Sequence, residues 1–253
     1  MTLSKKILHK ISDHFEVRPD AKNYLPRLQS HRGFRSRDIS LREGSNISLR
    51  EGSNISLREN TLASIQKAYE LGYLMVEFDV RLTKDRQVIL YHDDKIAGKH
   101  ISRLTLSEIQ LRQDVDLLTD VFLWYTKMKI ENFKFNIEIK SRTTNGILEK
   151  QVYQLVQKFV LQRNILISSF NPISLMYFRL FDQTIFRSLL LTFSNETGNN
   201  FVIKNMMLNV LARPNALHLN HEDWDYQKFK KMIEKNVPVV LWTCNDFNLI
   251  NQY

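Results

Sequence analysis

The sequence is poor in several residue types that mark particular classes of protein. Its single cysteine, Cys244, excludes an internal disulfide and a multi-cysteine zinc site, and is ordinary in a reducing compartment. Only 7 glycines are present, and they form no Gly-rich phosphate loop of the P-loop or dinucleotide-binding kind. No apolar run approaches the ~18 residues of a membrane span, and the basic N-terminus lacks the apolar stretch of a secretory signal. We therefore expect a cytoplasmic protein without a transmembrane segment.

The composition indicates a folded protein that prefers anionic partners. Apolar residues make up 43% and aromatic residues 11% of the chain, which allows a sizeable core. A net charge of +9 favours anions. Basic residues gather at 5–6, 127–142 and 228–235, where solvated helix faces explain them better than a nucleic-acid groove, because no nucleic-acid-binding motif accompanies them. We expect no nucleic-acid partner, and the charge is compatible with peripheral contact at an anionic membrane.

Acidic and histidine side chains are concentrated in residues 76–94, VEFDVRLTKDRQVILYHDD. Glu77 and Asp79 lie two apart in an apolar, β-branched run, so a strand would point both carboxylates to one face. After a short turn, a second apolar run ends at His92. Two convergent acids and a histidine at a strand end predict a hydrolytic site that uses a hard metal ion.

A later segment, 133–140, alternates in the same way. Asn136, Glu138 and Lys140 share one face of this predicted strand, and apolar residues share the other. The polar face either lines a cavity or faces water at the edge of a sheet. The pattern alone leaves both interpretations open.

The start of the chain contains a short repeat. ISLREGSN occurs at 39–46 and again at 47–54, and ISLRE returns at 55–59. The copies are too few for a solenoid, so we interpret 34–58 as a loop enlarged by tandem duplication. We expect residues 1–26 to form a basic N-terminal extension and 27–253 to form one domain.

Strand and helix patterns alternate over most of that domain. This alternation predicts a parallel sheet closed as a (β/α)8 barrel, with an open doubly wound sheet as the alternative. The link between the two strands of 76–94 is too short for a helical crossover, so the barrel should be irregular there. The predicted helices cover 62–71, 105–130, 147–161, 172–181, 201–211 and 224–235, and the later strands cover 165–170, 189–193, 216–220 and 237–243.

Several short motifs, taken in order, resemble one family. The chain is similar to the glycerophosphodiester phosphodiesterases, which implies a TIM-barrel enzyme that uses a divalent cation, Ca²⁺ or Mg²⁺. The motifs are His31-Arg32-Gly33, Glu59-Asn60-Thr61, Glu77-Phe78-Asp79-Val80 with Thr83 and Asp85, His92-Asp93, Ile137-Glu138-Ile139-Lys140, Ser168-Ser169-Phe170 and Leu241-Trp242-Thr243 with Asn245.

The resemblance also implies a role for each matching residue. His31 and His92 would be the catalytic pair. Glu77, Asp79 and Glu138 would hold the metal, Arg32 and Lys140 would contact the phosphate, and Trp242 would line the pocket; Glu59 matches a loop acid to which we assign no role. The residue types suit these roles, because Ca²⁺ and Mg²⁺ prefer oxygen ligands and histidine titrates near neutral pH.

The resemblance implies hydrolysis of a small-molecule glycerophosphodiester to glycerol 3-phosphate and an alcohol, with attack by the substrate's own hydroxyl through a cyclic phosphate. The alternatives are lysophospholipase D-type activity on lysophospholipids and an inactive barrel that binds phosphodiesters. The chain stops eight residues after Asn245, before a closing segment that the family usually has, so the barrel could be incomplete at its C-terminus. The oligomeric state is not readable from the sequence.

Overall fold

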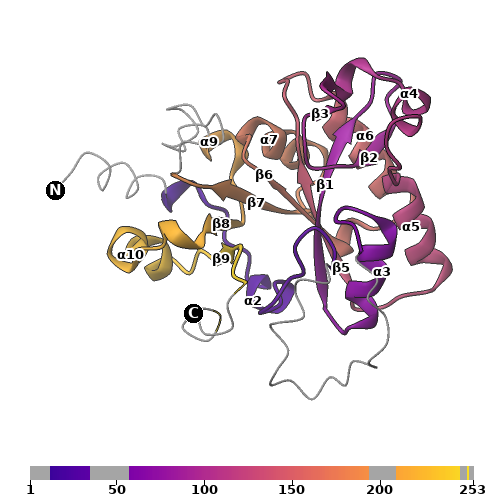
Figure 1. Ribbon diagram of the computed structural model, residues 1–253. Helices are drawn as coiled ribbons and strands as arrows, with labels where there is room; N and C mark the ends of the chain where they lie inside the picture. Colours follow the sequence, from indigo (N-terminus) through magenta and orange to yellow (C-terminus); the bar gives the residue numbers. More distant parts are fainter. Residues whose placement is uncertain (1–11, 35–56, 194–208, 246–249, 251–253) are drawn as a thin grey trace. The chain divides into compact units, whose positions relative to one another are not determined.

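The computed structural model describes residues 12–34, 57–193, 209–245 and 250 (Figure 1). The predicted repeat loop, 34–58, lies almost entirely outside the described residues, as does most of the predicted helix 201–211. The chain divides into two compact units: one is Arg27–Lys140 with Cys244–Tyr253, and the other is Met1–Pro26 with Ser141–Thr243. We call them the 27–140 unit and the 141–243 unit and describe each separately.

Three strands, in the order β2-β1-β5, organise the 27–140 unit. β1 (Met75–Leu82) runs antiparallel to β2 (Val88–Leu90) and parallel to β5 (Lys134–Ile139). The hairpin confirms that no helix connects β1 to β2. Because β5 pairs with β1 and its polar face is buried, Asn136 and Glu138 do not lie on a solvated edge, which resolves the alternative that the sequence left open.

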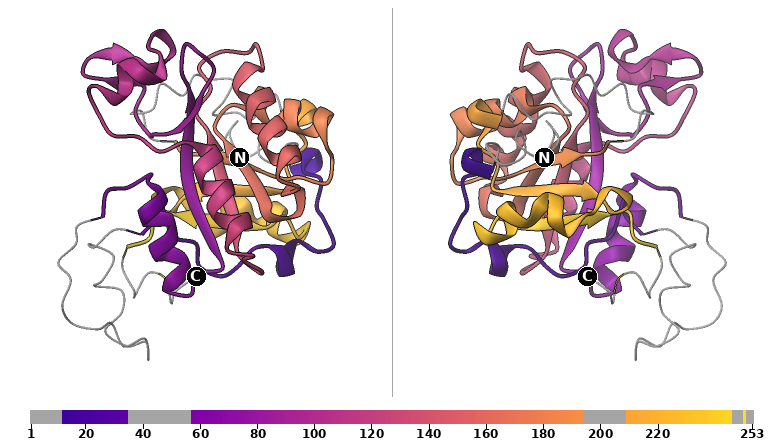
Figure 2. Two further views of the ribbon diagram at one scale, coloured as in Figure 1. Left: turned by 90° about the vertical axis from the view of Figure 1, so that its right-hand side faces the viewer. Right: turned by 90° about the vertical axis from the view of Figure 1, so that its left-hand side faces the viewer.

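Helices α3 (Leu62–Glu70) and α5 (Leu118–Lys127) are drawn beside β1 in the left view of Figure 2. α3 begins at Thr61, whose side chain accepts from the Ser64 N–H while the Ser64 side chain accepts from the Thr61 N–H, a reciprocal cap. The apolar faces of both helices are buried, and Phe122 and Tyr125 of α5 contact Phe135 of β5. These contacts fix the sheet from which the acidic residues project.

The prediction of one helical segment over 105–130 was wrong in its extent. The structure has α4 (Leu106–Gln110) and then α5, separated by a turn, and a small hairpin precedes them. This inserted module has its own core, because Ile89, Ile101 and Ile109 pack together. The hairpin strands are β3 (Lys95–Ile96) and β4 (Lys99–His100), followed by the 3-10 turn η3 (Ile101–Arg103).

Four parallel strands organise the 141–243 unit, in the order β6-β7-β8-β9, with helices between them. The prediction that β7 begins at 189 was wrong, because buried Arg187 lies inside the strand. Across the described residues, no helix combines the length and the apolar character needed to cross a membrane. The elements are η1 (Ser12–His14), α2 (Ala21–Tyr24), α6 (Ile147–Lys158), η4 (Gln162–Asn164), β6 (Ile165–Ser169), α7 (Pro172–Phe181), β7 (Phe186–Leu191), α9 (Asn209–Ala212), β8 (Ala216–Asn220), η5 (His221–Asp223), α10 (Tyr226–Glu234) and β9 (Val239–Trp242).

Candidate active site

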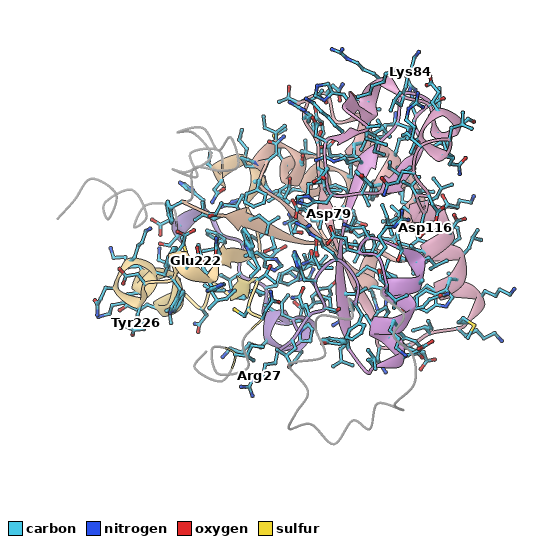
Figure 3. The ribbon with its side chains drawn as sticks, in the orientation of Figure 1. Arg27, Asp79, Lys84, Asp116, Glu222 and Tyr226 are labelled. Atoms are coloured by element: carbon cyan, nitrogen blue, oxygen red, sulfur yellow. The ribbon has the colours of Figure 1, made fainter. Side chains whose placement is uncertain are left out.

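Three carboxylates meet on one face of the β1–β5 pair. Glu77 and Asp79 alternate along β1, and Glu138 lies directly opposite Asp79 in the register of the parallel pair. Their ligand oxygens all lie within 4.8 Å of one another. Figure 3 labels Asp79, which is 1% exposed. The structure thus brings together the three residues that the sequence predicts as metal ligands.

Backbone hydrogen bonds place His31 and Arg32 next to these carboxylates. Ser30 N–H donates to the Met75 carbonyl, and Glu77 N–H donates to the Ser30 carbonyl, so the segment runs alongside β1. Gly33 follows with φ +78°, and a Cβ there would collide with the Ser64 side chain at the start of α3. Only glycine suits that turn. As a result, His31 Nε2 lies 3.9 Å from Glu77 Oε2.

Arg32 has a left-handed backbone conformation, with φ 54°. This conformation costs energy in a residue with a Cβ, and such strain is typical of functional sites. It turns the Arg32 N–H toward Glu77 Oε2, at 2.8 Å. The guanidinium contacts Glu59 at 2.9 Å and Asp79 at 3.5 Å. Arg32 therefore contacts three carboxylates with its backbone and side chain together.

Asn60 also binds Asp79. Its amide donates to Asp79 Oδ2 at 2.9 Å, and its carbonyl oxygen accepts from the Asp79 N–H at 2.8 Å. Asn60 also has a left-handed backbone, with φ 54°, a conformation that asparagine tolerates better than most residues. Asn60 belongs to the Glu59-Asn60-Thr61 motif, but the sequence alone predicts no role for it.

Lys140 lies between two of the carboxylates. Its Nζ is 2.6 Å from Glu138 Oε1 and 3.2 Å from Asp79 Oδ1. Burial favours the neutral amine, but Glu138 and Asp79 favour the charged one and raise the pKa of Lys140 above its usual value. Lys140 is therefore a cation whose position is fixed at the centre of the site.

The carboxylates divide into one anion and two groups that resist ionisation. Burial by itself raises the pKa of Asp79, but Lys140, His92 and Arg32 outweigh it and hold that pKa at about 2. Burial, followed by the charges of Asp79 and Glu138, raises the pKa of Glu77 well above its usual value. Burial also raises the pKa of Glu138, to about 7, with Asp79 adding to the effect and Lys140 opposing it. The positive charges around the three acids therefore do not fully neutralise them.

This incomplete neutralisation of the carboxylates agrees with a bound divalent cation. Glu77 Oε1 is buried and has no hydrogen-bond partner among the described residues. A buried acceptor without a donor is costly, and a metal ion would satisfy it. Three carboxylate oxygens with no sulfur suit a hard cation such as Ca²⁺ or Mg²⁺ better than zinc. The residues present therefore fit such an ion.

His92 follows β2 at the end of the hairpin, and Asp93 fixes its ring. His92 Nδ1 and Asp93 Oδ1 are 2.8 Å apart. Burial lowers the pKa of His92, Lys140 lowers it further, and Asp79 opposes them. The neutral imidazole is consequently the favoured form of this histidine near neutral pH.

Arg81 anchors the backbone at His92 and at Lys140, and no sequence pattern identified it. Its guanidinium donates to the His92 carbonyl at 3.0 and 2.7 Å and to the Lys140 carbonyl at 3.2 Å, and it pairs with Asp94 at 3.7 Å. The side chain is 13% exposed, so these bonds are largely shielded from water. Arg81 thereby links the end of β2 to the end of β5.

Trp242 belongs to the other unit. It ends β9, pairs in register with Asn220 of β8, and packs edge to face on Phe170 with 5.8 Å between ring centroids. Its predicted place beside the substrate stays a prediction, as do the roles of the other site residues.

Comparison with known protein families and structures gives a consistent result. A family model described as "Glycerophosphoryl diester phosphodiesterase family" matches residues 31–252. A protein of Caldanaerobacter subterraneus named glycerophosphodiester phosphodiesterase is 30% identical over 134 residues, which cover 46% of this chain and 54% of that protein.

Two solved structures show the likeness of fold. A phosphodiesterase of Oleispira antarctica, solved with the product sn-glycerol-3-phosphate, has a TM-score of 0.69 at 20% identity, covering 92% of this chain and 90% of that one. A glycerophosphodiester phosphodiesterase of Parabacteroides distasonis has a TM-score of 0.64 at 24% identity, covering 88% and 86%. The prediction of an α/β fold of the TIM-barrel type is confirmed.

Proposed function

Since the chain belongs to the glycerophosphoryl diester phosphodiesterase family, we propose that it hydrolyses glycerophosphodiesters to glycerol 3-phosphate and an alcohol. The observation that carries this proposal is the cluster of Glu77, Asp79 and Glu138, with Arg32 and Lys140 among them, His31 beside Glu77 and His92 near enough to lower the pKa of Asp79. The product named with the Oleispira antarctica structure supports the same chemistry.

Glu77, Asp79 and Glu138 would hold a divalent cation, Ca²⁺ or Mg²⁺, through their oxygens. When bound, that cation supplies positive charge that polarises a phosphoryl oxygen and lowers the pKa of an attacking hydroxyl. Arg32 and Lys140 would orient the phosphate and stabilise the negative charge that develops on it, because both are permanently charged at neutral pH.

His31 and His92 would move the protons. One takes a proton from the attacking hydroxyl while the other gives a proton to the leaving oxygen, and their roles exchange when water opens the cyclic phosphate. Because Asp93 contacts Nδ1 of His92, the proton that reaches the substrate would move at Nε2. Neutral His92, favoured by its lowered pKa, can start as the base or become the acid after one proton transfer.

The enzyme would work in the cytoplasm on small soluble diesters. Support for this location comes from the single cysteine, and the net charge of +9 suits an anionic substrate. Long-chain lysophospholipids are the competing substrate class, and a turnover assay distinguishes them directly.

The test is release of glycerol 3-phosphate from glycerophosphocholine, and of lysophosphatidic acid from lysophosphatidylcholine, by the purified full chain with Ca²⁺, Mg²⁺ or EDTA. We expect turnover of the soluble diester only with a divalent cation, and a loss of about 10²-fold or more in His31→Ala and His92→Ala. His221→Ala, on η5, is the matched control and should keep its activity. A folded wild type that releases nothing with either cation would contradict the proposal.

A further inference from the structure

A hollow lies beside His92 in the 27–140 unit. Its empty volume of about 430 Å³ includes space that is open to solvent. Its lining includes Glu59, His92 and Asp93 from the site already described, and Tyr91 and Gln113 from outside it. Nothing in the proposed hydrolysis of the phosphate requires Tyr91 or Gln113, so this part of the hollow needs its own explanation.

Tyr91 forms a fixed aromatic wall. Its ring packs against the core of the inserted module around Ile89 and Ile109, and the ring also lines the hollow. Its hydroxyl lies 3.3 Å from Gln113 Oε1, so the two side chains brace each other. The face of an aromatic ring is negatively polarised, and a cation is the ligand that such a face attracts.

The charges around the hollow favour a cation as well. Arg58 also lines it, but it pairs with Asp114 at 3.6 Å, and Glu59 pairs with Arg32 at 2.9 Å. Among the described residues, Asp93 contacts only the imidazole of His92, which lies 2.8 Å away and carries no permanent charge. The side chain of Asp93 is 72% exposed. Because Arg58 and Glu59 are each paired, the carboxylate of Asp93 is the charge that remains in the lining of the hollow.

The position of the hollow decides which half of the substrate it can receive. A phosphodiester has two alcohols, and the one that leaves must lie next to the histidine that protonates it. With His92 as the histidine that protonates the leaving oxygen, the hollow that His92 lines is placed for the leaving alcohol.

We propose that the hollow lined by Tyr91, Asp93 and Gln113 binds the leaving alcohol, and that it selects diesters of amino alcohols, whose nitrogen is positively charged. This inference rests on the proposed function. It extends that function by assigning the preference among head groups to these three residues of the 27–140 unit. Quaternary and primary ammonium alcohols share the required charge, and the assay compares them.

The experiment measures kcat/KM for glycerophosphocholine and glycerophosphoethanolamine against glycerophosphoglycerol, whose leaving alcohol is neutral. We expect wild type to prefer the charged pair. Gln113→Lys adds a positive charge to the lining and should lower the preference about threefold or more, while Gln113→Met removes the same amide without adding charge. Gln87→Lys, at the other end of β2, adds the same charge away from the hollow and should leave the preference unchanged.

A second pair of variants tests the aromatic wall. Tyr91→Phe keeps the ring and should keep the preference, whereas Tyr91→Leu should lower it about two- to fivefold, the range of a partly exposed cation–π contact. Thermal unfolding of each variant checks that the fold is retained.

The outcomes separate the two proposals. Turnover of all three diesters with a preference that none of these variants changes would overturn the head-group inference and leave the proposed function standing. An equal loss for all three substrates would also overturn it, because the hollow would then serve the shared glycerophosphate half. No release of glycerol 3-phosphate from any diester by folded wild type would overturn the proposed function and this inference together.

Discussion

His218 should make the fold less stable as the pH falls, independently of the active site. It lies in β8 of the 141–243 unit, between Leu190 of β7 and Val240 of β9, and is 3% exposed. Its Nε2 has no hydrogen-bond partner among the described residues. Burial without a charge partner lowers the pKa of His218 from 6.5 to about 3.

The sign and size of the effect follow from proton linkage. The unfolded chain binds a proton at the ordinary pKa of 6.5, while the folded chain does not bind one until the pH nears 3. Stability is therefore fully present above the unfolded pKa and is lost as the pH falls below it. At about pH 5 the proton stabilises the unfolded state by about 2 kcal/mol, and at about pH 7.5 by almost nothing. Any folded pKa below about 4 gives the same loss.

The measurement is urea unfolding of wild type and His218→Leu at about pH 5 and about pH 7.5, at one ionic strength and in EDTA so that metal binding does not contribute. The free energy of unfolding should fall between the two pH values by about 2 kcal/mol more in wild type than in the variant. His218→Gln, which is polar but does not titrate, should behave as the leucine variant does. Equal pH dependence in all three proteins would refute the reasoning.

The result also bears on catalysis. An activity that fails below about pH 6 would ordinarily be assigned to protonation of catalytic histidines. If His218→Leu keeps its fold at low pH but loses activity as wild type does, the acidic limb belongs to His31 and His92. If the variant stays active to lower pH, the limb reports unfolding.

Three further predictions concern the site and its support. Arg81→Lys should lower kcat about 10- to 100-fold with little change in Tm, because lysine cannot bond both the His92 and Lys140 carbonyls. Steady-state kinetics of this variant, measured beside the exposed control Arg103→Lys, would show the loss. Glu138→Gln should abolish the rise in Tm that Ca²⁺ or Mg²⁺ gives wild type, and Glu108→Gln is the matched control. An undiminished rise in Glu138→Gln would contradict the assigned ligand set. Glu16→Ala should lower stability by about 1 to 2 kcal/mol, because fully buried Arg187 loses a carboxylate 3.0 Å away that is itself 41% exposed and partly screened by water. Glu222→Ala on the surface should be neutral in the same unfolding assay.

The carboxylate cluster could be predicted from the sequence because strand geometry determines it. Alternation puts Glu77 and Asp79 on one face of β1, and the parallel register with β5 puts Glu138 opposite Asp79. Hydrophobic pattern alone was enough to locate both strands. The ordered motifs then indicated the family.

Asn60 and Arg81 could not be assigned in the same way. Asn60 acts through a paired amide contact with Asp79, and Arg81 acts through two backbone carbonyls far apart in the sequence. No periodicity records such bonds. Arg187 shows the same limit in the fold. A charged residue argues against a buried strand, and this one is accepted there because its guanidinium pairs with Glu16, 171 residues away, and donates to the Ile185 carbonyl.

The charge balance of the site argues that its cation is divalent. Four carboxylates, those of Glu59, Glu77, Asp79 and Glu138, share two side-chain cations, Arg32 and Lys140, in the contacts between described residues. Two negative charges remain, and without a metal the folded protein meets this excess by raising the pKa of Glu77 and Glu138, which then hold protons. A divalent ion would replace those protons, so its binding should release protons to the buffer. Titration calorimetry with Ca²⁺ in buffers of different ionisation enthalpy measures that release; no release near neutral pH would mean that the carboxylates were already ionised and that the charge argument is wrong.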